Sequence, residues 1–205
     1  MRNARFSVFL AAALLLASHP VLAQAPGAPA PAFTLADTSG KPVKLSDYRG
    51  KFVVLEWTNP ECPFVRKHYD SGNMQGLQKP WGARDVVWLT VNSTNTASSE
   101  YKTPAQMTQW LDGQGASPKA ALIDGTSATG RAYGARTTPH MFVIDPSGTV
   151  IYNGAIDDRR TTSLADAKVA HNYVRAALTE AMEGRPVSVA TTSPYGCSVK
   201  YGSLL

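Results

Sequence analysis

The chain has 205 residues, of which 43% are hydrophobic and 17% charged, so it is long enough for one ordinary folded domain and too apolar for a disordered protein. Its formal net charge of +5 comes from basic residues that are scattered and not interleaved with aromatic ones, which argues against a nucleic-acid-binding surface.

Residues 1–23 have the parts of a signal peptide. Arg2 and Arg5 form a basic start, and residues 6–17 are apolar but shorter than the roughly 20 residues of a membrane span. Small or tolerated residues then allow cleavage after Ala23. A retained N-terminal anchor is the alternative. The pattern predicts a periplasmic or secreted protein that does not contact the membrane after cleavage. Such a protein works in an oxidising compartment.

A Pro/Ala-rich linker is expected at residues 24–31, a single domain at 32–186, and a C-terminal tail at 187–205. The predicted strands are apolar runs bounded by turn residues, at residues 32–35, 41–45, 52–58, 85–92, 121–124, 141–145 and 149–152. The predicted helices cover residues 63–79, 103–113, 126–133 and 164–183. Gly72 and Gly76 should weaken the second half of the first helix.

This order of elements predicts an α/β fold with a central mixed β-sheet and helices on both faces. An N-terminal β-hairpin, with its turn at Ser39 and Gly40, precedes the sheet, and the tail follows the last helix. Open α/β sheets carry their chemistry at the carboxyl ends of central strands. Cys62 stands at such a junction, between the apolar run 52–58 and a helix that begins at Pro63.

Cys62 is therefore the candidate nucleophile. The free N–H groups and the dipole of a helix N-terminus favour the thiolate over the thiol. Arg66, one turn further along the helix, adds positive charge, whereas the neighbouring Glu61 opposes ionisation. A purely structural cysteine is the alternative.

Two segments carry a family resemblance. Residues 31–35 together with 50–55 resemble the opening of the redoxin group, which comprises the alkyl hydroperoxide reductase/thiol-specific antioxidant (AhpC/TSA) domain and its thioredoxin-like relatives. Thr138 and Pro139, followed by an apolar strand, resemble the cis-proline segment of the thioredoxin fold. The resemblance implies a thioredoxin-like fold, a cis Pro139 facing Cys62, and a Thr138 whose backbone pairs with the substrate. A trans proline at an edge strand is the alternative.

The chain departs from both familiar site patterns of that group. Val65 stands where the thioredoxin Cys-x-x-Cys motif has its second cysteine. Leu55 and Asn59 stand where peroxiredoxins have the proline and threonine of their peroxide site. The chain most resembles the peroxiredoxin-like subgroup with a lone cysteine at the first thioredoxin position. That resemblance implies a thiol oxidoreductase of antioxidant character that acts on a protein disulfide or a small peroxide and is recycled by an external thiol reductant.

Cys197 is the expected resolving cysteine, because the tail can fold back over the mouth of the site. A static Cys62–Cys197 disulfide and two separate or intermolecularly paired thiols remain as alternatives. Trp57, Pro63 and Arg66 are expected beside the thiol, where they would help to position the substrate.

A second hypothesis is a non-enzymatic binding protein for copper or a partner chain. Cys62, His140 and Met141 are soft ligands of the kind that suits copper(I). No Gly-rich phosphate loop, Ser/His/Asp arrangement or carboxylate pair stands out, so no cofactor is expected.

Overall fold

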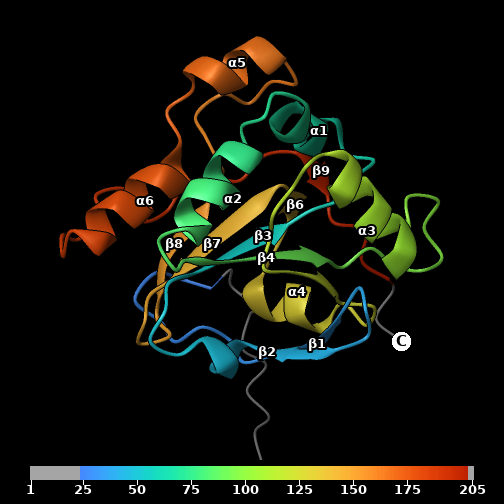
Figure 1. Ribbon diagram of the computed structural model, residues 1–205, viewed down its shortest axis with the longest axis horizontal. Coiled ribbons are helices and arrows are strands. Elements are labelled where there is room, and N and C mark those ends of the chain that lie inside the picture. The colour runs from blue at the N-terminus through green and yellow to red at the C-terminus, as the bar shows by residue number, and fades with distance from the viewer. Residues whose placement is uncertain (1–23, 203–205) are drawn as a thin grey trace, which may run out of the picture.

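A computed structural model describes residues 24–202, and the segment expected to be a signal peptide lies outside them. A seven-stranded mixed sheet with the order β2-β1-β5-β4-β3-β7-β8 forms the centre of the fold (Figure 1). Its strands are β1 (Thr34–Asp37), β2 (Pro42–Lys44), β3 (Val53–Trp57), β4 (Val87–Asn92), β5 (Ala120–Ile123), β7 (His140–Ile144) and β8 (Val150–Gly154). A separate pair joins β6 (Thr137–Thr138) to β9 (Cys197–Ser198). The helices are a 3₁₀ turn (Leu45–Tyr48), α1 (Pro63–Asp70), α2 (Gln75–Gly82), α3 (Pro104–Gly113), α4 (Ala128–Tyr133), α5 (Leu164–Val169) and α6 (Tyr173–Met182).

The central strand β3 runs parallel to β4 and antiparallel to β7, which makes the sheet mixed as predicted. All five residues of β3 are buried, because α2 and α6 lie on one side of the sheet and α4 on the other (Figure 1). The prediction of a thioredoxin-like α/β fold with an N-terminal hairpin is confirmed. The carboxyl end of β3 leads directly to Cys62 and α1, so the fold places the thiol at the edge of its central strand.

Successive side chains of β3 point to opposite faces of the sheet and divide the core into two layers. We call the cluster that contains Val54, Cys62 and Met141 the thiol layer. The cluster that contains Leu55 and Trp57 is the opposite layer. This division decides which of the expected site residues can meet Cys62.

The two longest predicted helices are each divided. The helix predicted at residues 63–79 is α1 and most of α2, separated at Gly72, whose φ of 76° breaks the helix as predicted. Gly76, also expected to weaken the helix, lies inside α2, which continues to Gly82. The expectation of one helix over residues 164–183 is wrong. Ala170 is extended with a ψ of 144°, and the Asn172 side chain accepts a hydrogen bond of 2.9 Å from the backbone N–H of Arg175. Asn172 thus caps a new helix, α6, where the pattern had suggested continuity.

Both ends of the described chain are tied to the domain. The backbone N–H of Gly27 donates to Val150 at 2.8 Å, and that of Ala30 donates to Gly148 at 2.9 Å, so these linker residues pair with the β7–β8 hairpin. At the other end, β9 pairs antiparallel with β6. The tail is therefore a docked segment up to the last described residues.

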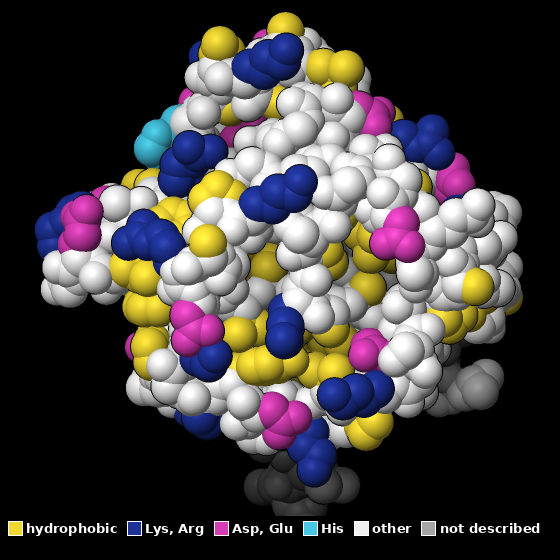
Figure 2. All heavy atoms as spheres, viewed as in Figure 1, with side chains coloured by type: hydrophobic (Ala, Val, Ile, Leu, Met, Phe, Trp, Pro, Cys, Tyr) yellow, Lys and Arg dark blue, Asp and Glu magenta, His cyan; other side chains and the backbone are white. Residues whose placement is uncertain are grey.

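None of the helices within residues 24–202 is long and apolar enough to span a membrane. On the face seen in Figure 2, lysine and arginine side chains are interspersed with aspartate and glutamate and do not gather in one basic patch.

Candidate active site

Cys62 is the N-cap residue of α1. Its backbone is extended, with φ −76° and ψ 119°, and its carbonyl accepts a hydrogen bond of 2.9 Å from the N–H of Arg66. Pro63 occupies the first turn, where the missing N–H of proline costs nothing. The Cys62 side chain makes no capping hydrogen bond to the helix start, so its sulfur is available for other contacts.

The Cys62 thiol donates a hydrogen bond of 2.9 Å to the backbone carbonyl of Thr138. The peptide bond between Thr138 and Pro139 is cis. In the β6–β9 pair, Thr138 lies opposite Cys197, so the tail strand brings the second cysteine to the carbonyl that Cys62 already contacts. A segment near the C-terminus and the first β-to-α junction thereby form one site.

The two cysteines are free thiols, and the β6–β9 register holds Cys197 opposite the residue whose carbonyl Cys62 contacts. Burial, and next to it the neighbouring Cys62, raise the pKa of the Cys197 thiol above its usual value. Cys197 therefore keeps its proton while it lies against the Cys62 sulfur.

Gly196 allows the tail to pass this closely. Its φ is 134°, and a Cβ built on it would lie 2.0 Å from the carbonyl oxygen of Thr138. No other residue type could cross the carbonyl at this distance without displacing the strand.

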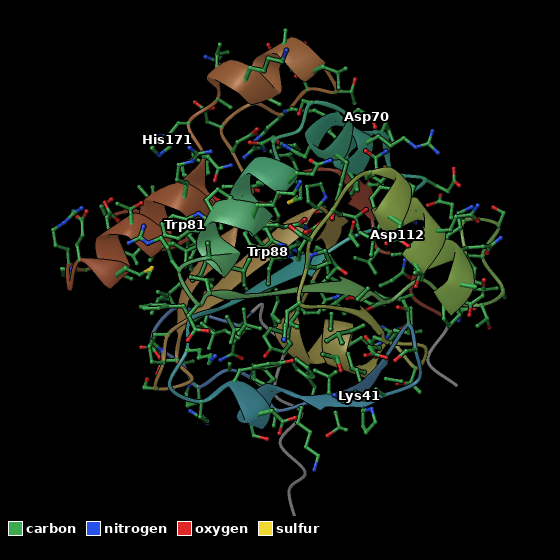
Figure 3. The ribbon with its side chains drawn as sticks, viewed as in Figure 1. Lys41, Asp70, Trp81, Trp88, Asp112 and His171 are labelled. Carbon is green, nitrogen blue, oxygen red and sulfur yellow. The ribbon has the colours of Figure 1, made fainter. Side chains whose placement is uncertain are left out.

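The site is closed in this structure, since Cys62 has no exposed surface. A hollow of about 690 Å³ lies between the α1–α2 turn and the α5–α6 pair, beside His171 in Figure 3, but neither cysteine lines it. Access to Cys62 therefore requires a movement of segments that cover it.

Residues 26–153 match the family model described as the AhpC/TSA family. The chain belongs to the AhpC/TSA family.

Curated relatives and solved structures add to this assignment. The thiol-disulfide oxidoreductase ResA of Bacillus subtilis is 28% identical over 132 residues, which cover 61% of this chain and 64% of ResA. ResA of Geobacillus thermodenitrificans is 27% identical over 135 residues, which cover 62% of this chain and 68% of that protein. The chain thus spans about two thirds of these relatives. An uncharacterized conserved protein from Geobacillus kaustophilus superposes with a TM-score of 0.76 at 26% identity, over 88% of this chain and 94% of that one.

Two of the residues expected to contact the thiol make other contacts in this AhpC/TSA-family chain. Trp57 is fully buried in the opposite layer, where its indole N–H donates to Ser93 Oγ at 3.0 Å. The expectation of Trp57 beside Cys62 overlooked that β3 turns this side chain to the other face. The Arg66 guanidinium donates to the Pro60 carbonyl at 2.7 Å and to Glu61 at 3.0 Å, and is not directed at the sulfur.

The alternation of side chains along a strand also argues against the copper(I) hypothesis. His140 and Met141 are neighbours on β7, and their side chains lie on opposite faces of the sheet. Both nitrogens of the His140 ring are engaged, with Asn153 Oδ1 at 2.7 Å and the N–H of Arg136 at 3.2 Å. Burial lowers the pKa of His140 to about 4. The three residues cannot gather around one ion.

Glu56 is a buried carboxylate that the sequence interpretation missed. It lies on the thiol-layer face of β3 and accepts hydrogen bonds of 2.8 Å from Tyr69 and from the indole of Trp88, which lies between α2 and the sheet (Figure 3). Burial raises the pKa of Glu56 to about 7, although these hydrogen bonds oppose the rise. A single acidic residue inside an apolar strand was the available signal.

A second missed feature surrounds Tyr195, two residues before Cys197. Its hydroxyl lies among the buried side chains of Lys67, His68 and Asp157. The lysine and histidine occur in a helix that would normally place them in solvent, so no sequence signal marked them as buried.

Proposed function

We propose that this protein is an exported thiol-disulfide oxidoreductase in which Cys62 is the nucleophile and Cys197 the resolving cysteine. The observation that carries the proposal is the meeting of the two thiols at the Thr138 carbonyl. The similarity to the ResA thiol-disulfide oxidoreductases supports the same reaction class.

The reaction is two successive thiol-disulfide exchanges. The Cys62 thiolate attacks one sulfur of a substrate disulfide, which forms a mixed disulfide and releases the other sulfur as a thiolate. The Cys197 thiolate, formed as its proton passes to the departing substrate sulfur, then attacks the Cys62 sulfur. This step forms the Cys62–Cys197 disulfide and releases the second substrate thiol. Two electrons pass to the substrate, and an external thiol reductant restores the dithiol.

The residues near the thiols have different roles in this reaction. Pro63 starts the helix that Cys62 caps and so fixes the position of the nucleophile. Thr138 and Pro139 fix the position of the carbonyl that accepts the hydrogen bond of the Cys62 thiol. A substrate chain that displaces β9 would pair with the same backbone segment. Arg66 acts indirectly, because it is paired with Glu61 beside the site.

A small peroxide is the second candidate substrate, because the AhpC/TSA family is named for this antioxidant chemistry. In that case Cys62 would be oxidised to a sulfenic acid, and Cys197 would condense with it to give the same disulfide and water. Asn59 lacks the hydroxyl that the peroxiredoxin site supplies at this position, so we favour the disulfide.

Export remains part of the proposal and rests on the N-terminal sequence. Mature protein isolated from the periplasm or medium should begin at Gln24, which N-terminal sequencing would detect.

The central experiment is equilibration of the purified protein in glutathione buffers of increasing oxidation. Alkylation and mass spectrometry at each step measure the fraction with a Cys62–Cys197 disulfide. We expect reversible conversion with a reduction potential above about −300 mV, the region of exchangeable disulfides. A disulfide that resists reduction across the whole series would identify a static staple and overturn the proposal.

The Cys197→Ser variant separates the two roles. We expect it to accumulate a mixed disulfide between Cys62 and a model disulfide substrate, because no second thiol remains to release it. The matched Cys62→Ser variant should form no such adduct. Adduct formation through Cys197 alone would reverse the assigned roles.

A further inference from the structure

Lys67 and Asp157 form a buried ion pair next to the site. Their side chains are 0% and 1% exposed, and the lysine nitrogen lies 3.5 Å from Asp157 Oδ2. The same nitrogen donates to the carbonyl of Arg159 at 2.6 Å. Buried charges are costly unless their hydrogen-bonding groups find partners. A tyrosine that hydrogen-bonds to both charges therefore contributes strongly to the stability of the pair.

The Tyr195 hydroxyl supplies one partner to each charge, while Asp157 Oδ2 has only its ion-pair contact with Lys67. It donates to Asp157 Oδ1 and accepts from Lys67 Nζ at 3.3 Å. Its third neighbour is His68 Nε2, also at 3.3 Å, while His68 Nδ1 accepts from the Asn73 amide at 2.8 Å. That network assigns the His68 proton to Nε2, which donates to the phenol oxygen. One hydroxyl thus makes all the hydrogen bonds of which it is capable.

Burial shifts the pKa values of Tyr195 and His68 in this cluster. Burial and the contact with Asp157 raise the pKa of Tyr195 far above its usual value, so the phenol remains a donor. Burial and Lys67 lower the pKa of His68 to about 3, so this ring is neutral. Nε2 of the neutral ring lies 3.9 Å from Asp157 Oδ2, and Lys67 Nζ lies 3.5 Å from the same oxygen.

The Tyr195 ring also packs against α1. The Phe64 ring meets it edge-on at a centroid distance of 5.8 Å, and the Lys67 nitrogen lies 5.5 Å from its centroid. Phe64, Lys67 and His68 belong to one face of the helix that Cys62 caps. The receptor for the tyrosine and the nucleophile are therefore fixed to the same rigid element.

Tyr195 is only two residues before Cys197, so the anchor is close to the second thiol. An extended chain advances about 3.3 Å per residue, so Cys197 cannot move far from Cys62 while Tyr195 is held. Gly196, between Tyr195 and Cys197, lies against the Thr138 carbonyl, so this short connection has little freedom to move.

We propose that Tyr195 is a positioning residue, and that its docking on the buried Lys67–Asp157 pair holds Cys197 against Cys62. This inference rests on the proposed function and extends it to a residue outside the two thiols. Release of the tyrosine would both uncover Cys62 and withdraw the resolving thiol.

The test uses the full chain with Tyr195→Phe, which keeps the ring but removes the hydroxyl. In the glutathione buffers we expect the equilibrium constant for the Cys62–Cys197 disulfide to fall at least about tenfold, because hydrogen bonds to charged groups are lost. In the reduced protein we expect iodoacetamide to modify Cys62 faster, as measured on its peptide by mass spectrometry. A purely structural role would lower the melting temperature and leave both thiol readouts unchanged.

Tyr133→Phe is the matched control. The Tyr133 hydroxyl donates to the Pro31 carbonyl at 2.8 Å in the opposite layer, so the same atom is removed from the other face of the sheet and not from the Tyr195 cluster. Thiol readouts in Tyr195→Phe that equal those of the wild type, or shifts of the same size in the control, would overturn the inference. If wild-type protein never exchanges its thiols but Tyr195→Phe still uncovers Cys62, the positioning role stands and the proposed redox function fails.

Discussion

Glu56 is a carboxyl group whose ionisation the fold changes. It lies in the middle of the fully buried strand β3, with no exposed surface. Its two hydrogen-bond donors, Tyr69 and Trp88, hold the carboxyl group in place but do not offset the cost of burying its charge. A folded-state pKa of about 7, above the ordinary value of 4.5, means that the native state retains a proton that the unfolded chain loses.

The free energy of unfolding should therefore fall as the pH rises between about 4.5 and 7. The shift in pKa corresponds to a loss of about 3 kcal/mol, complete above pH 7. Glu56→Gln keeps an acceptor but cannot ionise, so its stability relative to the wild type should increase over this window. Urea unfolding at a series of pH values measures the difference. The exposed Glu183→Gln is the control, and parallel curves for Glu56→Gln and wild type would contradict the prediction.

At the scale of an element, the strand β9 has only two residues, yet it closes the site. Its pairing with β6 contributes few backbone hydrogen bonds, so its position depends on what flanks it. Tyr195 anchors one side, and Gly196 makes the close approach to the Thr138 carbonyl possible. A short strand held in this way can leave its place without disrupting the seven-stranded sheet, which is what access to Cys62 requires.

Gly196→Ala should expel β9 from this position. The new Cβ would lie 2.0 Å from the Thr138 oxygen, in a backbone conformation that side chains rarely adopt. We expect alkylation of Cys62 to accelerate by about tenfold or more, because a cost of about 1–3 kcal/mol shifts the tail toward the open state. Gly184→Ala is the matched control, since Gly184 also has a positive φ of 73° but nothing within 4 Å of its added Cβ. Equal alkylation rates in both variants would contradict the steric argument.

At the scale of the whole molecule, the sheet separates two core layers that have different tasks. The thiol layer joins Cys62 to α1, α2, α6 and the tail. The opposite layer packs the N-terminal hairpin and α4 against the other face of the sheet. A change in the opposite layer should therefore alter stability without altering the chemistry.

Trp57→Phe tests this separation. We expect a loss of about 2 kcal/mol of stability, because the smaller ring leaves a gap and Ser93 loses its indole partner. The second-order rate of Cys62 with a disulfide probe should stay within about twofold of the wild-type rate. Phe64→Leu is the counterpart in the thiol layer, and it should accelerate that reaction because Phe64 packs on Tyr195. A large change of the Cys62 rate in Trp57→Phe would show that the sheet does not isolate the layers.

Local patterns in the sequence determined much of this protein. The apolar run before Cys62, the turn residues of both hairpins and Pro63 at a helix start act over a few residues, so they could be read directly. They were enough to predict the α/β fold and the position of the candidate nucleophile. The break before α6 was missed because the capping preference of Asn172 competes with a continuous apolar pattern, and only packing decides between them.

The tertiary structure alone decided which residues share a surface. Because side chains alternate along a strand, Trp57 and His140 point to the face of the sheet opposite the thiol, although both are close to site residues in the sequence. The docking of the tail brought Cys197 to Cys62 and buried Lys67 beneath Tyr195. These outcomes depend on contacts between segments far apart in the chain, whose free energies exist only once the layers have packed. The sequence specified a thiol at a helix start, and the packed fold gave that thiol its partner.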